Sequence, residues 1–242
     1  MKRSVLTLTA LALASCGDGA GGNAGTPAAP VAAVKAPAGQ NWLETSAKTA
    51  EGYVLGNPDA PIKLVEYGSR LCPACKGFAD TGYRPLTEQY VSTGKVSFEF
   101  REFLIHGAAD LPPALLGQCG GAAPFFPLME QMYANQTAFV DKWQATPPAV
   151  QAQLQTAKPA QAVTLLAEQM GLVDFVKQRG IPEAKARACL SDTAAIDRLT
   201  KITQDRGADG TVSGTPTLIV NGKKVDGIGW GDVEKALKAA GA

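Results

Sequence analysis

The sequence predicts a mixed α/β protein in which a block of helices is inserted into a β-sheet. Strand-like patterns lie in residues 52–103 and return in residues 217–225. Between about residues 108 and 206 the β-branched runs disappear, and apolar residues recur at helical spacing. A sheet whose strands come from both sides of such a block predicts an inserted helical subdomain.

Three strands are expected before the insertion. Residues 52–56 form a short strand candidate, followed by an Asn-Pro-Asp turn signal. Residues 62–67 form an apolar run interrupted only by Lys63 and Glu66, which is typical of a central strand. Residues 96–103 alternate apolar and polar side chains, which indicates a strand with one covered face.

Helices are expected after the central strand and throughout the insertion. The first spans residues 73 to about 91, with Pro73 in the first turn, where a missing N–H costs little. Pro85 should kink or divide this helix. The insertion should contain helices near residues 114–119, 125–133, 163–170 and 184–190, with an exposed connection or weak helix over 146–159.

The β pattern returns close to the end of the chain. Residues 217–220 form a strand candidate, and an Asn-Gly pair predicts a tight hairpin turn into residues 223–225. Residues 230–240 carry apolar side chains on one helical face. A final hairpin and a closing helix are therefore expected.

The first fifty residues have the composition of an export signal followed by a tether. Residues 1–15 combine a basic start, an apolar stretch too short to span a membrane, and small residues, which is typical of a secretory signal. The Leu-Ala-Ser-Cys run ending at Cys16 resembles a bacterial lipobox, which implies lipidation of Cys16; an ordinary signal peptide with an incidental cysteine is the alternative. Residues 16–51 are then the anchor cysteine and a flexible tether, and the folded domain spans 52–242.

The net charge of the chain and its predicted compartment limit the classes of function that the sequence supports. The formal net charge is +1, and it becomes −1 once the predicted signal with its lysine and arginine is removed. A near-neutral chain gives no electrostatic reason to expect a nucleic-acid partner. Export would place all five cysteines in a compartment where disulfides persist.

The candidate reactive group is Cys72-Pro73-Ala74-Cys75, between the central strand and the helix that follows it. A helix N-terminus carries unpaired N–H groups and a partial positive charge, so it stabilises a thiolate placed there. The thiolate is the nucleophile in disulfide exchange. We therefore expect Cys72 to be the reactive sulfur and Cys75 its partner.

A metal site is the alternative for a Cys-X-X-Cys pair, because this spacing supplies half of many zinc sites. His106 is the only histidine, and no second close cysteine pair exists. The redox interpretation is therefore favoured, no metal is expected, and His106 is expected to be a loop residue. Cys119 and Cys189 are expected to form a structural disulfide inside the insertion, with two unpaired buried cysteines as the alternative.

A second motif makes the redox interpretation of the dithiol more specific. The Gly-Asn-Pro-Asp-Ala-Pro run at residues 56–61, the strand into the dithiol, and Gly-Thr-Pro-Thr at 214–217 resemble the thioredoxin superfamily. Within it, residues 52–242 are similar to the DsbA-like thiol–disulfide oxidoreductases of bacterial envelopes. The resemblance implies a thioredoxin-like fold with a helical insertion, and a cis Thr215–Pro216 bond facing the dithiol, where an extended substrate pairs. The alternative is a trans proline that begins an edge strand.

The same resemblance suggests roles for individual residues. An acidic residue near the dithiol assists proton transfer at the inner cysteine, which implies this role for Glu66; a carboxylate on the polar face of the strand is the alternative. Pro73 and Ala74 should tune the redox balance. Strong oxidases of the family have a histidine at the position of Ala74, so a less extreme thiolate is expected here, supported by the helix terminus and by Arg70 or Lys76.

The predicted function is disulfide formation in exported proteins, without a cofactor, on the periplasmic side of a membrane to which the protein is lipid-anchored. A DsbB-like membrane partner would reoxidise the dithiol. A monomer is favoured, because residues 17–51 are too few for the dimerisation domain of the superfamily's isomerases. A reductase or isomerase of the same fold, and a non-catalytic binding or metal-delivery protein, are the alternatives.

Overall fold

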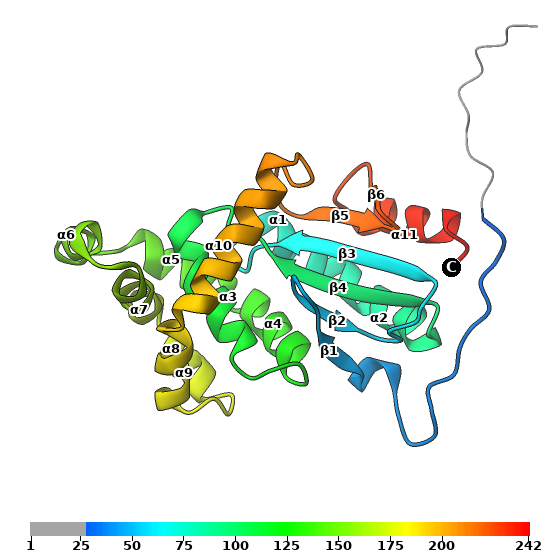
Figure 1. Ribbon diagram of the computed structural model, residues 1–242, viewed down its shortest axis with the longest axis horizontal. Helices are drawn as coiled ribbons and strands as arrows, with labels where there is room; N and C mark the ends of the chain where they lie inside the picture. Colours follow the sequence, from blue (N-terminus) through cyan, green and yellow to red (C-terminus); the bar gives the residue numbers. More distant parts are fainter. Residues whose placement is uncertain (1–27) are drawn as a thin grey trace, which may run out of the picture.

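A six-stranded sheet forms the centre of the computed structural model, which describes residues 28–242 (Figure 1). Its strands are β1 (Ser46–Lys48), β2 (Tyr53–Leu55), β3 (Ile62–Gly68), β4 (Val96–Glu102), β5 (Thr217–Val220) and β6 (Lys223–Lys224). They are ordered β1-β2-β4-β3-β5-β6. Only β3 and β4 run parallel, and every other neighbouring pair is antiparallel. The predicted central position of β3 and the terminal hairpin of β5 and β6 are confirmed.

The parallel pair requires a crossover connection, and the predicted helix after β3 supplies it. This helix is divided as predicted, into α1 (Pro73–Phe78), a π-helical turn (Ala79–Tyr83) and α2 (Arg84–Gln89). Pro85 lies in the first turn of α2, where its missing N–H leaves one hydrogen bond of the preceding helix unmade. The chain therefore widens into a π turn directly before it.

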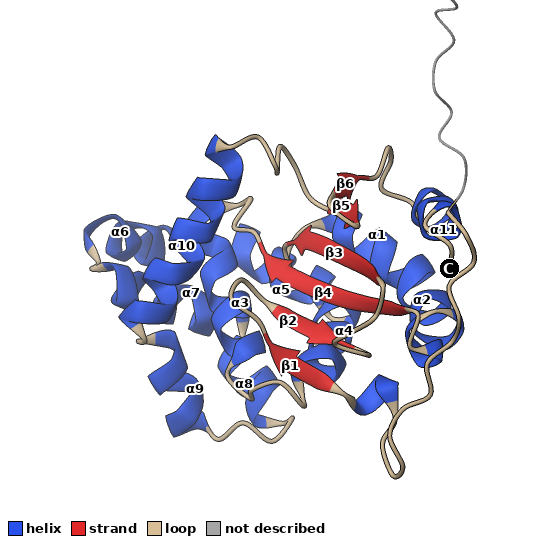
Figure 2. Cartoon of the chain, turned by 45° about the vertical axis from the view of Figure 1, so that its right-hand side comes forward, coloured by secondary structure: helices blue, strands red, loops and turns tan. Residues whose placement is uncertain are grey.

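Helices cover one face of the sheet and bury its apolar side chains. This face of β3 and β4 packs against α1, α2, α4 (Phe125–Ala134) and α11 (Trp230–Ala239) (Figure 2). Phe98 and Phe100 of β4 form one core cluster with Phe78, Leu86 and Leu237 from these helices. The amphipathic closing helix predicted from the sequence is α11, which buries Val233 and Leu237.

The predicted helical insertion lies between β4 and β5 and has a core of its own. Leu116, Met132, Leu166 and Leu190 belong to this second cluster. Its helices besides α4 are α3 (Leu111–Gln118), α5 (Gln136–Gln144), α6 (Pro148–Thr156), α7 (Pro159–Met170), α8 (Leu172–Lys177), α9 (Glu183–Leu190) and α10 (Thr193–Ala208). Helix α6 contains no buried residue, as its proline- and glutamine-rich sequence predicts. The sequence patterns do not delimit α5, α8 and α10, although all three lie in the helical range.

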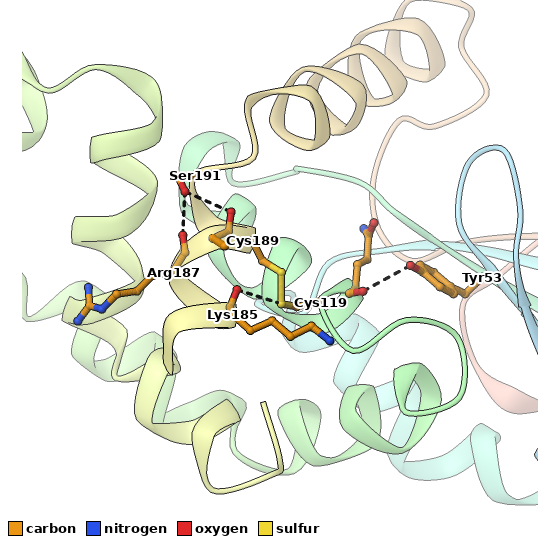
Figure 3. The surroundings of a disulfide bond; sticks show 8 residues. Tyr53, Cys119, Lys185, Arg187, Cys189 and Ser191 are labelled. Atoms are coloured by element: carbon orange, nitrogen blue, oxygen red, sulfur yellow. Dashed lines mark hydrogen bonds between the residues drawn. A yellow bond between two sulfur atoms is a disulfide. The ribbon is translucent and has the colours of Figure 1, made fainter. Parts of the chain in front are cut away.

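A disulfide ties two helices of the insertion together. Cys119, which follows α3, is bonded to Cys189 of α9, and the Cα atoms are 5.9 Å apart (Figure 3). The two residues are separated by 70 positions in the sequence. Closing a loop of this size reduces the entropy of the unfolded chain, which stabilises the fold by about 4 kcal/mol in the chain-entropy model.

The start of the folded domain corrects the predicted boundary at residue 52. Strand β1 pairs with β2, and the Trp42 side chain is buried with its Nε1–H donated to the Val34 carbonyl at 2.7 Å. Upstream, the Val31 N–H donates to the Gly241 carbonyl at 2.7 Å. A three-residue strand is too short to produce a readable periodicity, so the sequence assigned it to the tether. The predicted signal and Cys16 lie outside the described residues.

Candidate active site

The two cysteines of the motif lie at the carboxyl end of β3, where the chain turns into α1. Cys72 is the N-cap residue of α1 and Pro73 is its first residue. Cys72 is nearly buried, with 7% of its area exposed, whereas Cys75, one turn later, is fully buried. Neither cysteine is part of a disulfide in this structure. The geometry therefore distinguishes an outer sulfur from an inner sulfur.

Hydrogen bonds to the outer sulfur favour its charged form. They lower the pKa of Cys72 from 9.0 to about 5, and the largest cause is the hydrogen bond from the Cys75 thiol. Partial burial opposes this shift, while the Thr215 hydroxyl and the backbone N–H groups of Cys75 and Ala74 reinforce it. The backbone donors are the first unpaired N–H groups of α1. Cys72 is therefore a thiolate at neutral pH.

Arg70 was expected to support the Cys72 thiolate, but its guanidinium is paired with Glu102 instead. Its guanidinium is fully buried and its Nε donates to Glu102 Oε1 at 2.8 Å. It also lies over the Phe125 ring, 4.9 Å from the centroid. Lys76 pairs with Asp80 on the surface of the helix at 2.5 Å. The thiolate depends instead on hydrogen bonds at the start of α1 and on the loop opposite it.

That opposing loop is the Gly-Thr-Pro-Thr segment, 143 positions away in the sequence. The Thr215–Pro216 peptide bond is cis, and the Thr215 carbonyl oxygen lies 3.3 Å from Cys72 Sγ. The loop reaches this place because β5, which begins at Thr217, pairs with β3. The Thr215 hydroxyl is buried and has no hydrogen-bond partner in this structure, so it is available to donate to a thiolate.

Glu66 lies on the covered face of β3, and the alternative placement on a polar face is wrong. Its side chain is fully buried; Oε2 accepts a hydrogen bond from the Tyr83 hydroxyl at 2.7 Å, and Oε1 has no partner. Burial raises the pKa of Glu66 to about 8; the Tyr83 hydrogen bond opposes this increase, and the negative charge of Cys72 adds to it. Burial also raises the pKa of Cys75, and Glu66 adds to that increase. The two groups therefore influence each other's protonation.

Two side chains of the insertion hold the backbone that leads into the dithiol. The buried Gln136 amide donates to the carbonyls of Arg70 at 3.0 Å and Cys72 at 2.9 Å. The buried Tyr133 hydroxyl donates to the Ser69 carbonyl at 3.3 Å. Sequence reasoning missed both residues, and Tyr83 as well, because their partners are backbone carbonyls or a side chain from another element. No local pattern marks such contacts.

Across residues 28–242, no three histidine, cysteine, aspartate or glutamate side chains are grouped so as to hold a metal ion. Within the same range, no helix combines the length and apolarity needed to cross a bilayer.

The sheet order, the dithiol at the start of α1 and the cis-proline loop beside it define a thioredoxin-fold protein with an inserted helical subdomain. The family model described as thioredoxin matches residues 48–239, and the chain belongs to this family.

Three known proteins illustrate what the chain is similar to. A Rickettsia bellii protein assigned as a protein-disulfide oxidoreductase is 27% identical over 187 residues, which are 77% of this chain and 63% of that protein. Disulfide bond formation protein D of Bacillus subtilis is 34% identical over 65 residues, which are 27% of this chain and 29% of that protein. The crystal structure of a protein-disulfide isomerase from Novosphingobium aromaticivorans is 27% identical with a TM-score of 0.73, covering 78% of this chain and 97% of that one.

The chain matches only part of the length of its relatives. The chain spans 63%, 60% and 59% of the length of three Rickettsia relatives. Wolbachia pipientis alpha-DsbA1 shares the fold, with a TM-score of 0.60 at 19% identity over 76% of this chain and 87% of that one.

Proposed function

We propose that this chain is a thiol–disulfide oxidoreductase that forms disulfides in exported proteins through Cys72 and Cys75. The observation that carries the proposal is that the pKa values of the two sulfurs are shifted in opposite directions. The outer sulfur of Cys72 has its pKa lowered to about 5, whereas burial raises the pKa of Cys75 well above its ordinary value. Disulfide exchange requires such a pair, because attack and departure take place at a stabilised, accessible sulfur.

In the oxidising direction, a substrate thiolate attacks Sγ of Cys72 in the Cys72–Cys75 disulfide. The S–S bond breaks, Cys75 leaves with the electron pair and takes up a proton, and a mixed disulfide forms on Cys72. A second substrate thiolate attacks the substrate sulfur of that mixed disulfide. Cys72 then leaves as a thiolate, the substrate gains a disulfide, and the protein has accepted two electrons. The low pKa of Cys72 makes it the better leaving group.

Glu66 is the proposed proton donor and acceptor for Cys75. Its Oε1 has no hydrogen-bond partner, and its pKa of about 8 lets it hold a proton at neutral pH. Tyr83 holds the other oxygen and so orients the carboxyl group. Thr215 and Pro216 are the proposed edge on which an extended substrate pairs, while Pro73 and Ala74 tune the thiolate.

Replacing Glu66 by glutamine should slow the step in which Cys75 leaves and takes up a proton by roughly 100-fold, because general acid–base catalysis is lost. The pH dependence of stability should also change. Between the unfolded value of 4.5 and the native value of about 8, Glu66 holds a proton in the native protein that it has lost in the unfolded chain. The contribution of Glu66 to stability therefore falls as pH rises through this range, opposite in sign to that of Cys72, and Glu66→Gln should remove it, so that the variant becomes more stable relative to the wild type as pH rises.

Stopped-flow thiol exchange and urea unfolding of the reduced protein at both ends of this range measure the two effects. The matched control is Glu88→Gln, since Glu88 is exposed on α2. A Glu66→Gln variant with the exchange rate and pH–stability profile of Glu88→Gln would contradict the proton-transfer role.

The direction of electron flow is tested by the reduction potential, with oxidation of reduced ribonuclease and reduction of insulin disulfides as assays. A dithiol that oxidises substrates should have a potential above about −200 mV and should oxidise ribonuclease. A potential near about −270 mV with insulin reduction would favour the reductase function. A potential below about −300 mV with neither activity would overturn the enzymatic function.

Isomerisation is the second candidate, because the similar Novosphingobium aromaticivorans structure is named a protein-disulfide isomerase. In that direction Cys72 attacks a substrate disulfide first, and Cys75 releases trapped intermediates. Refolding of ribonuclease with scrambled disulfides separates this activity from net oxidation.

The cellular setting belongs to the same proposal. The protein would work as a monomer on the periplasmic side of a bacterial membrane, held by lipid on Cys16, and a DsbB-like membrane partner would reoxidise its dithiol. Metabolic labelling with a fatty acid, compared between wild type and Cys16→Ala, tests the anchor. Lack of label in the wild type would remove the lipid from the proposal.

A further inference from the structure

His106, the only histidine of the chain, lies at the same edge of the sheet as the dithiol. Strands β3 and β4 are parallel, so the segments that leave their carboxyl ends are neighbours. Cys72 follows β3, and His106 follows β4 directly before the short 3-10 helix Gly107–Asp110. Because Pro73 and Ala74 carry no charge, any cation that acts on Cys72 must come from outside the motif.

A hydrogen-bond network links the imidazole to the dithiol segment. His106 Nδ1 lies 3.2 Å from both carboxylate oxygens of Asp110, and the backbone N–H of His106 donates to Asp110 at 2.6 Å. Asp110 also accepts the Ser69 hydroxyl at 2.6 Å. The Ser69 carbonyl in turn accepts the Cys72 N–H at 3.1 Å. The imidazole is thus held beside the segment that carries the reactive sulfur.

The surroundings of the ring favour its protonated form. The hydrogen bond to Asp110 raises the pKa of His106 above its ordinary value, and the charges of Asp110 and Cys72 raise it further, while burial opposes them. The Trp143 ring of α5 packs edge-on at 5.8 Å and carries no charge. Two negatively charged groups, Asp110 and the reactive sulfur of Cys72, therefore stabilise the protonated imidazole.

We propose that protonated His106, held by Asp110, is a cation that stabilises the Cys72 thiolate and so makes the disulfide more oxidising. The inference rests on the proposed dithiol chemistry and adds a positioning residue to it. Protonation of His106 cancels the charge of Asp110, which would otherwise oppose a thiolate nearby. The other buried ion pair at this edge, Arg70 with Glu102, is already neutral as a pair.

The first test uses the wild-type protein and the ring-proton resonance of its single histidine. Coupling between two sites is reciprocal, so a charge that stabilises the thiolate must itself be stabilised by it. The pKa of His106 should therefore be higher in the reduced protein, where Cys72 is a thiolate, than in the oxidised protein. A difference of roughly 0.3 to 1 pH unit, a two- to tenfold change in the acid constant, is expected for two interacting charges near the protein surface.

The second test follows the Cys72 thiolate by its ultraviolet absorbance. His106→Asn should raise the pKa of Cys72 by the same amount, and His106→Lys should restore it. The control Arg84→Gln removes a cation that is 83% exposed on α2 and should change nothing. The reduction potentials of the four proteins should follow the same order.

Equal histidine pKa values in the two redox states would overturn the proposal without any variant, and would leave His106 with a structural role. An unchanged Cys72 pKa in a folded His106→Asn variant would also overturn the proposal. Failure of the proposed function has a different appearance: wild-type Cys72 would not titrate below neutrality, and no substrate would be oxidised at any histidine charge.

Discussion

Cys72→Ser should abolish thiol–disulfide exchange, with loss of activity to the uncatalysed level. Of the two cysteines, only Cys72 keeps any exposed area, 7%, because Cys75 is fully buried. A serine hydroxyl at this position is neither ionised at neutral pH nor able to form a disulfide. Ribonuclease oxidation and insulin reduction should both fall to background, while the melting temperature with the Cys119–Cys189 bond intact should change little.

Cys75→Ala is the informative partner of this variant. It leaves the Cys72 thiolate accessible but removes the internal sulfur that releases a mixed disulfide. Substrates should therefore remain covalently bound to Cys72, and they can be separated by non-reducing electrophoresis and identified by mass spectrometry. Removal of one hydrogen bond from Cys75 should also raise the pKa of Cys72. Exchange activity retained in Cys72→Ser would place the chemistry at another sulfur.

Glu102→Leu should destabilise the fold by about 3–5 kcal/mol, because it leaves the Arg70 guanidinium buried without its partner. The side chains of Arg70 and Glu102 are only 1% and 3% exposed, and they meet at 2.8 Å. Gly117 of α3 makes room for the guanidinium, since a Cβ there would lie 2.3 Å from Arg70 Cζ. Urea unfolding of the oxidised protein measures the loss.

The converse variant, Arg70→Leu, should cost less. Glu102 can take up a proton, whereas arginine stays charged at any pH that a protein tolerates. Burial already raises the pKa of Glu102, and removal of Arg70 raises it further. The variant should therefore lose stability as pH rises above the ordinary carboxyl value, since its native state then holds more protons than the unfolded chain.

The double variant Arg70→Leu/Glu102→Leu completes the cycle and should recover much of the stability lost in Glu102→Leu. Additive losses in the cycle, or a single Glu102→Leu variant within about 0.5 kcal/mol of the wild type, would show that the pair contributes no coupling.

Most of the sheet and the two motifs could be predicted from the sequence. Strands β2, β3, β4 and β5 carry their pattern within a few residues, and so do the Asn-Gly turn and the divided helix at Pro85. Strand β1 and the buried Trp42 were missed, since Gly, Ala and Pro around them give a tether-like composition. The pairing of β1 with β2 depends on an edge that the composition does not reveal.

The local sequence was sufficient to predict the dithiol, its place at a helix start and the proline loop. Each of these is a short run of residues with its own backbone preference. The tertiary structure alone decided what surrounds them: Tyr83 on Glu66, Gln136 on the backbone carbonyls, and Asp110 between His106 and Ser69. These contacts join residues from 4 to 66 positions apart across the parallel register of β3 and β4 and the docked insertion. Protonation depends on such neighbours, since burial and nearby charges set a pKa, and neither is a property of a short run of residues.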